Sequence, residues 1–339
     1  MSDTPSGDVR RVLQLLLAVV WVLDGLLQFQ PFMYTTAFGK LLAATAAGNP
    51  GFIARPITWD ATLVNHHLAL VNTLFATIQL LLGLGIAFRP TVRLALGASI
   101  VWALSVWWLG EGLGGVLNGT ANPFTGAPGA VIIYARLAVV LWPVGYDLAG
   151  RHSAGRRTGT RTFAAARAVG APVARLLWAV LWLSLAYFAL LPANRAPQAM
   201  HDAIAGMVSG DPAWLAAVER NAASLVAQQG LAASIAFAVA FVAIAVGVFL
   251  PRPYARAAVL LALVVSAVIW VVGEAFGMIL IGGATDPNSG LLLALLALSF
   301  WPPRSAVPAE PQEPKDQAEP TVLPAAETAR TAALEGNLA

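Results

Sequence analysis

Apolar stretches long enough to cross a membrane follow one another along the first 302 residues. A helix needs about 20 apolar residues to span the hydrocarbon of a bilayer, and most of these stretches reach that length. The composition agrees, because 58% of the side chains are hydrophobic and only 11% are charged. The sequence therefore predicts an all-α integral membrane protein with about eight transmembrane helices, at roughly 12–30, 63–88, 94–117, 128–146, 175–192, 227–250, 255–280 and 288–302.

Basic residues are distributed unevenly between the two ends of these spans. With a cytoplasmic N-terminus, the cytoplasmic segments contain all of the 20 Lys and Arg residues except Lys40, Arg55, Arg136, Arg195 and Arg220. The positive-inside rule then predicts a multi-pass protein of the cell (cytoplasmic) membrane with both termini in the cytoplasm. The chain has no cysteine, which excludes disulfides and thiolate metal sites. Nothing in its charge pattern indicates nucleic-acid binding.

The pattern W-x-x-G-E-x-x-G occurs twice, starting at Trp107 and again at Trp270. Two flanking motifs also recur, "FRPTVR" at 88–93 as "PRPYAR" at 251–256 and "GNPGF" at 48–52 as "GDPAW" at 210–214. We interpret this as a tandem duplication of a four-helix transmembrane unit, and an even number of spans gives both copies one orientation about a parallel pseudo-twofold along the membrane normal. The positions that define the repeat are Gly110, Glu111 and Gly114, matched by Gly273, Glu274 and Gly277.

The repeat divides the chain into five parts. They are a cytoplasmic N-terminus (1–11), a first four-helix membrane unit (12–146), an Arg-rich cytoplasmic linker (147–174), a second four-helix membrane unit (175–302) and a disordered cytoplasmic tail (303–339). Within the two units, the more polar segments 31–62 and 193–226 are expected to form surface helices across the outer mouth of each bundle.

In the first unit, a surface segment "YTTAFGKLLAATAAGNPGF" leads to a helix ending "QLLLGLGIAFRPTVRLAL". This order resembles the DoxX-like family of small four-helix membrane proteins. The resemblance covers each half in outline and rests on the G-x-P turn and the L-G-L-G-x-x-x-R helix end. It implies the four-helix fold, although family members typically carry one unit and this chain carries two. Some relatives are associated with membrane redox systems, including quinone-linked sulfur oxidation, but no catalytic residue can be carried over.

Ionisable residues inside the predicted spans concentrate in the first half and at one depth. With a rise of about 1.5 Å per residue, Asp24 and Glu111 are expected about 9 Å below the outer boundary, the two histidines about 5 Å and Arg136 about 12 Å. Charged residues in a membrane usually pair or mark a functional site. The sequence thus predicts an outward-facing polar pocket in the N-terminal half, with the ligand-binding candidates Asp24, Gln28, His66, His67, Glu111 and Arg136.

Each candidate also has a purely structural interpretation. Glu111 and Glu274 persist in both copies, which favours a role in the shared fold, with the carboxylate hydrogen-bonded where glycines bring segments close. Arg136 is expected to pair with Glu111 or Asp24, in preference to the alternative that it binds an anion. His66, with Asp24 and Glu111, is a candidate for holding a divalent metal or hydrogen-bonding a quinone, whereas the alternative is an interfacial histidine bonded to loop backbone.

Three classes of function follow. The first is a ligand-binding or redox-accessory membrane subunit, quinone- or metal-linked, which acts with a membrane redox partner or a small-molecule ligand. The alternatives are a small-solute or ion transporter and a membrane scaffold for a partner protein. Polarity that stops in the outer leaflet provides no path across, which favours binding over transport. No complete catalytic constellation is visible, so enzymatic activity stays open. Loss of ligand in His66→Ala and Glu111→Ala, but not in Glu274→Ala, is the specific prediction of this pocket.

Overall fold

The structure of the chain is a computed structural model that describes residues 7–143 and 163–303. All regular structure in these ranges is helical, which confirms the predicted all-α class. Five helical segments are long and apolar enough to cross a membrane, so the chain is a helical membrane protein. They are Leu68–Ala87, Arg89–Leu109, Ala171–Ala189, Gly230–Gly247 and Arg252–Gly273.

The first half begins with α1 (Gly7–Leu27) and the short helix η1 (Pro31–Tyr34). Two amphipathic helices follow, α2 (Thr36–Ala44) and α3 (Gly51–His66), in the segment predicted to form surface helices. The chain then forms α4 (Leu68–Ala87), η2 (Arg89–Thr91) and α5 (Val92–Leu109). After η3 (Gly112–Gly115) and η4 (Pro123–Thr125), the half ends with the 11-residue helix α6 (Ala130–Val140).

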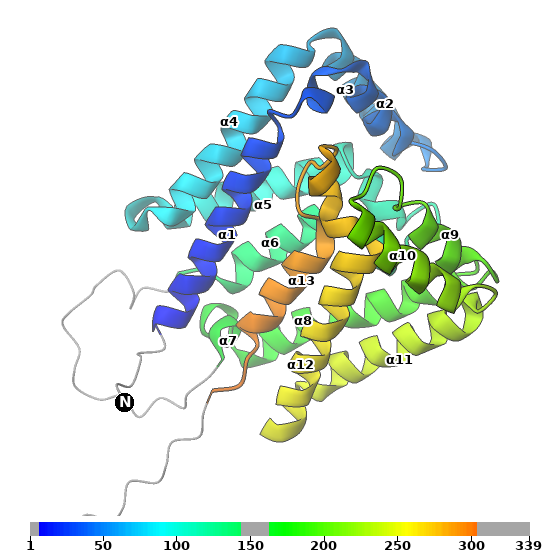
Figure 1. The fold of residues 1–339 in the computed structure, drawn as a ribbon. Coiled ribbons are helices and arrows are strands. Elements are labelled where there is room, and N and C mark those ends of the chain that lie inside the picture. Colours follow the sequence, from blue (N-terminus) through cyan, green and yellow to red (C-terminus); the bar gives the residue numbers. More distant parts are fainter. Residues whose placement is uncertain (1–6, 144–162, 304–339) are drawn as a thin grey trace, which may run out of the picture. The chain divides into compact units, whose positions relative to one another are not determined.

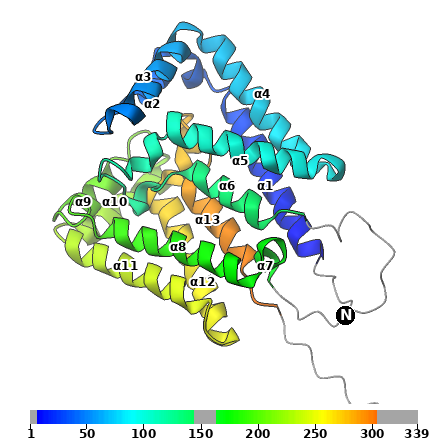
Figure 2. The same cartoon turned by 180° about the vertical axis from the view of Figure 1, so that it is seen from behind.

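The second half runs through a closely similar order of elements. After α7 (Ala164–Val169) come α8 (Ala171–Ala189), the amphipathic pair α9 (Ala199–Ala205) and α10 (Ala213–Val226), then α11 (Gly230–Gly247) and α12 (Arg252–Val268). The π-helical turn η6 (Ile269–Gly273) and η7 (Ala275–Ile281) lead to the 12-residue helix α13 (Asn288–Ser299). The same pair of long helices packs together in each half, α1 against α4 in the first and α8 against α11 in the second (Figures 1 and 2).

The two short helices α6 and α13 pack against each other and carry the junction between the halves. α6 is flanked by α5 and α13 by α12 (Figure 2). Most side chains of both are buried, as expected for helices that are apolar on all sides. Helices on the outside expose large apolar side chains instead, such as Leu70 at 72% and Leu94 at 77%, which suits a lipid environment.

Arginine side chains close the helix ends at one end of the first bundle. Arg11 of α1 donates to the carbonyls of Ile86 and Ala87 at the end of α4, and Arg10 donates to the Trp142 carbonyl just beyond α6. The last carbonyls of a helix lack partners within the helix, and a cation there also interacts favourably with the helix dipole.

Several predicted boundaries are wrong. The span predicted at 94–117 ends its α-helix at Leu109, and a left-handed run at 112–115 follows shortly after. The one at 255–280 ends its α-helix at Val268, continues as a π-helical turn to Gly273 and meets a left-handed run at 275–278. A right-handed helix cannot include such residues, so neither span reaches its predicted end. Glu111 therefore follows a helix rather than lying within it. α7 and the start of α8 fall in the predicted linker, while 1–6, 144–162 and 304–339 lie outside the described residues.

Candidate functional site

The repeated tryptophan holds the turn that precedes the last helix of each half. Trp107 Nε1 donates to the Pro128 carbonyl at 2.6 Å, and Trp270 Nε1 donates to the Pro287 carbonyl at 2.8 Å. Each indole thereby ties the end of one long helix to the start of the short helix that follows. The same bond in both halves explains why the sequence repeats a tryptophan at these two positions.

The repeated glutamate caps the following helix. Glu111 Oε1 accepts from the backbone N–H groups of Ala130 (3.0 Å) and Val131 (3.3 Å), in the first turn of α6. Glu274 accepts from the N–H groups of Ser289 (3.2 Å) and Gly290 (2.9 Å) and from the Ser289 hydroxyl, at the start of α13. A carboxylate satisfies otherwise unpaired N–H groups there and interacts with the positive end of the helix dipole.

The repeated glycine permits this close approach. Gly114 has a φ of 61°, and a Cβ on it would overlap the Pro128 carbonyl. Gly277 has a φ of 70°, and its Cβ would lie 2.6 Å from the Pro287 carbonyl carbon. The three repeated residue types therefore form one local device, which we call the clamp. It supports the structural interpretation of Glu111 and Glu274.

Four carboxyl groups gather where the two clamps meet. Asp24 of α1 is 1% exposed, and its Oδ2 accepts from the Tyr134 hydroxyl at 2.6 Å. Asp286, in the loop before α13, lies close enough to repel Asp24, Glu111 and Glu274. We call these four acids and Tyr134 the acidic centre. It draws residues from both halves of the chain.

The loop before α6 separates the two glutamates. A Cβ on Gly129 would overlap Glu111 Oε2, and a Cβ on Gly126 would lie 3.4 Å from Glu274 Oε1 and 2.8 Å from Asn288 Oδ1. Both glycines are left-handed, with φ of 112° and 106°. The first-half loop thus reaches the second-half glutamate, and the acidic centre lies at the junction of the halves.

Oxygen atoms in the acidic centre and beside it are left without donors. Asp24 Oδ1, Glu111 Oε2 and, one helical turn from Asp24, Gln28 Oε1 are buried and accept no hydrogen bond in the described structure. Asp286 is better satisfied, because it accepts from the Asn288 N–H at 2.7 Å and the Thr285 hydroxyl at 2.9 Å. Burial raises the pKa of Asp286 above its ordinary value, and these hydrogen bonds oppose the rise.

The structure unites only some of the predicted site residues. Asp24 lies on α1 and Gln28 follows directly after its last residue; the Gln28 carbonyl accepts from the buried Asn72 amide at 2.6 Å. Glu111 contributes to the same region from the end of α5. The site is therefore not confined to the N-terminal half, since Glu274 and Asp286 of the second half complete it.

The histidines lie elsewhere. His66 and His67 are exposed at the α3–α4 junction, and the His66 ring is bonded to the Thr62 carbonyl at 2.7 Å. This geometry matches the alternative interpretation, a histidine bonded to local backbone. Within residues 7–143 and 163–303, no group of three or more His, Cys, Asp or Glu side chains is arranged to hold a metal ion, so His66, Asp24 and Glu111 form no such set.

The predicted pairing of Arg136 with Glu111 or Asp24 is wrong. Its guanidinium donates instead to the Leu177 carbonyl of α8 at 2.9 Å. Tyr134 faces Asp24, and two residues along a helix turn the side chain by about 200°, so Arg136 points away from the acidic centre.

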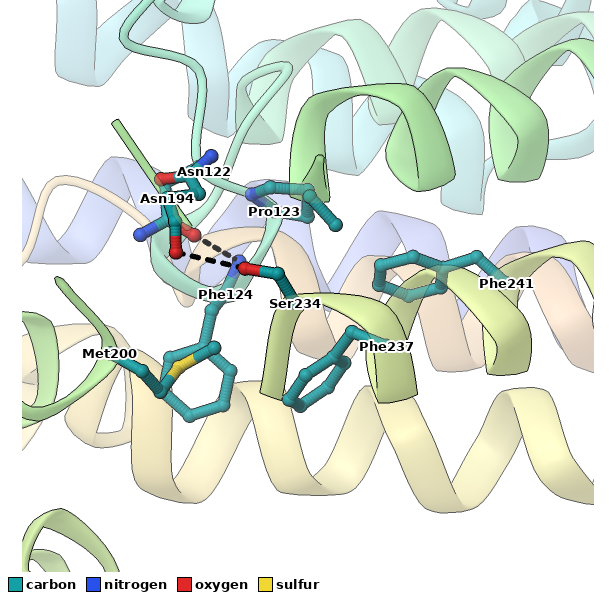
Figure 3. A pocket seen from close by; sticks show the side chains of 9 residues that line it. Asn122, Pro123, Phe124, Asn194, Met200, Ser234, Phe237 and Phe241 are labelled. Carbon is teal, nitrogen blue, oxygen red and sulfur yellow. Dashed lines mark hydrogen bonds between the residues drawn. The ribbon is translucent and has the colours of Figure 1, made fainter. Parts of the chain in front are cut away.

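A small pocket lies beside the junction (Figure 3). Phe124 enters it from the first half, 5.4 Å from the ring of Phe237, while Ser234 donates to the Asn194 carbonyl at 2.8 Å. The cavity volume is about 10 Å³, which is room for about one water molecule, so the pocket is too small for a quinone headgroup. This pocket offers a mostly apolar seat for Phe124 rather than a site for a quinone.

Tyr134 and Asp286 were missed in the sequence. Asp286 stands in "GGATDPNSG", where the turn formers explain an aspartate as a loop residue, and nothing local reveals that the loop is partly buried. Tyr134 stands one residue from the middle of an apolar helix. Only its spacing of two residues from Arg136 could have suggested that the two side chains lie on opposite sides of α6.

The chain was compared with protein-family models, curated proteins and solved structures, and none of the three comparisons gave a match.

Proposed function

We propose that this chain is a multi-pass, ligand-binding protein of the cell membrane whose acidic centre binds a small positively charged ligand. The ligand class comprises the proton and small ammonium-type cations that donate hydrogen bonds. The observation that carries the proposal is the set of buried oxygens without donors, Asp24 Oδ1 and Glu111 Oε2, beside the further carboxyl of Asp286.

Physical chemistry favours such a ligand. A buried acceptor without a donor costs roughly 1–3 kcal/mol, and more if it is charged. A positive charge placed between several carboxylates reduces the electrostatic repulsion among them. A quinone headgroup presents carbonyl oxygens, which accept, so it complements this acceptor-rich site less well. We therefore place a cation or proton ahead of the quinone and divalent-metal links considered from the sequence.

The wider architecture is part of the same proposal. The recurrent order of elements and the two clamps support a tandem duplication of a four-helix unit, with α1, α4, α5 and α6 matched by α8, α11, α12 and α13. We also propose that the chain is related to the DoxX-like family, that it crosses the membrane eight times and that both termini are cytoplasmic. The arginines at the ends of α1 and α4 support placing that end of the bundle at the cytoplasmic surface.

The test is thermal unfolding in lipid nanodiscs with ammonium chloride or tetramethylammonium chloride at equal concentration. Both salts screen charge equally, but only ammonium donates hydrogen bonds. We expect saturable stabilisation of the wild type by ammonium, or by lowered pH if the proton is the ligand. The variant Asp24→Asn should lose this response, because it keeps the size of the side chain and removes its charge.

Asp202→Asn is the matched control, since this aspartate is exposed on α9, outside the acidic centre. It should respond as the wild type does. A wild type that shows neither response, or an Asp24→Asn protein whose responses equal those of the wild type, would contradict the proposal.

A further inference from the structure

Two acidic side chains of the second half, Asp211 and Glu219, face each other away from the acidic centre, and we call them the acid pair. Glu219 lies on α10 and is fully buried, and Asp211 stands in the loop that leads into the same helix. All four carboxyl oxygens of the pair are buried, and none has a hydrogen-bond donor among the described residues. An ionised carboxylate in such a place is costly, because burial removes water and nothing replaces its hydrogen bonds.

The first half has no acids at the matching positions. When "GNPGF" is aligned with "GDPAW", Asp211 matches Asn49, and the same offset matches Glu219 with Ile57. The Asn49 amide donates to the Gly112 carbonyl at 3.4 Å, and Ile57 is fully buried on α3. A surface helix of this kind therefore packs with an amide and an aliphatic side chain at these positions, so the acid pair is a feature of the second half alone.

A hydrogen bond between two carboxyl groups requires a proton on one of them. Asp211 is the hydrogen-bond partner of Glu219, yet a carboxylate can only accept, whereas a protonated carboxyl donates. Burial and this contact raise the pKa of Glu219 to about 7, and the positive charge of Arg220 opposes the rise. On α9, which packs against α10, the ionisable side chains are His201 and Asp202, bonded to each other at 2.9 Å, and η6 has none.

We propose that the acid pair binds one proton, shared between Asp211 and Glu219, and that this proton holds α10 in place against η6 and η7. The ring of Trp214 at the start of α10 lies 6.0 Å from that of Phe276, which in turn lies 4.9 Å from Trp270 of the second clamp. When the proton passes to water, two adjacent negative charges repel each other and weaken this packing. With both termini cytoplasmic, as proposed above, the pair lies at the outer surface and responds to the external pH.

Hydrogen exchange of the α10 amides tests this proposal, measured by mass spectrometry on the full chain in lipid nanodiscs and corrected for the intrinsic effect of pH. When α10 opens, the Glu219 pKa returns to its ordinary value of 4.5, so the closed helix binds the proton more tightly. Protection of α10 in the wild type should therefore fall by up to about tenfold per pH unit, the limit for one proton, between pH 4.5 and about 7. Above that range it should level off.

Glu219→Gln should remove this dependence and keep α10 protected at pH 8, because its amide donates to the Asp211 carboxylate without a proton from solution. Asp202→Asn is the matched control, since it removes an exposed carboxylate from the neighbouring helix, and it should follow the wild type. Asp211→Asn keeps the test decisive if the glutamine variant does not fold. Its amide donates to the Glu219 carboxylate, so the dependence on pH should weaken.

Equal pH profiles in the wild type and Glu219→Gln would overturn the proposal, as would a folded Asp211→Asn protein with the wild-type profile. A wild type whose α10 protection does not change with pH would also overturn it. So would a wild type that regains protection at pH 8 when Ca²⁺ is added, because the acid pair would then be a site for a metal ion rather than for a proton.

Discussion

Replacing Gly114 by alanine tests the clamp most sharply, because the structure separates two costs. The left-handed conformation of Gly114 costs an alanine about 1–2 kcal/mol. Its Cβ would also overlap the Pro128 carbonyl, and forcing an atom into a packed site costs about 1–3 kcal/mol more. We therefore expect Gly114→Ala to lower the free energy of unfolding by about 2–5 kcal/mol.

Gly119 supplies the matched control. It is also left-handed, with φ of 75°, but a Cβ there would meet nothing within 4 Å. Gly119→Ala should therefore cost only the conformational part, about 1–2 kcal/mol. For a chain of this size, each kcal/mol lowers Tm by about 2–4 °C, so Gly114→Ala should unfold several degrees below Gly119→Ala. Equal Tm values in lipid nanodiscs, followed by tryptophan fluorescence, would refute the clamp geometry.

Three further predictions concern single side chains. Trp270→Phe removes the second clamp's hydrogen bond and should cost about 1 kcal/mol, seen as a lower Tm. Burial and the neighbouring Asp211 carboxyl raise the pKa of Glu219 from 4.5 to about 7. The folded state thus holds this proton more tightly than the unfolded state, so the contribution of Glu219 to stability is fully present below pH 4.5 and is lost as pH rises through about 7. Glu219→Gln should flatten that part of a plot of Tm against pH, and an unchanged slope would contradict the assignment. Tyr134→Phe removes the donor to a buried carboxyl group and should cost about 1–3 kcal/mol, whereas Tyr187→Phe, at an exposed position, should cost little.

The helical membrane class followed from the sequence because long apolar stretches have few other stable states. The spacing of the W-x-x-G-E-x-x-G motif likewise drew attention to the residues that form both clamps. The structural role of the motif could not be predicted from the sequence, because Trp107 and Glu111 bond to backbone groups about 20 residues further along the chain. Hydropathy also continued through Gly112 and Gly114, so the helix was predicted to extend past its true end.

Only part of the acidic centre was predicted, because the sequence indicates how deep a residue lies along a helix but not which way its side chain points. Depth along a span can be estimated from residue counts, which placed Asp24 and Glu111 in one layer. Direction around a helix axis depends on packing, and the sequence alone did not show that Arg136 points away from them. The contribution of Asp286 depends on how the two halves meet, which no local pattern records.

The most direct test of the acidic centre is infrared titration of the wild type and Asp286→Asn in lipid nanodiscs. Because burial raises the pKa of Asp286, we predict a protonated-carboxyl band that persists above the ordinary titration range of aspartate. The difference between the two proteins isolates the band, and added ammonium chloride should shift or diminish it. A wild-type spectrum identical to that of Asp286→Asn in this region, and unchanged by ammonium, would contradict the claim that these carboxyl groups bind a positively charged ligand.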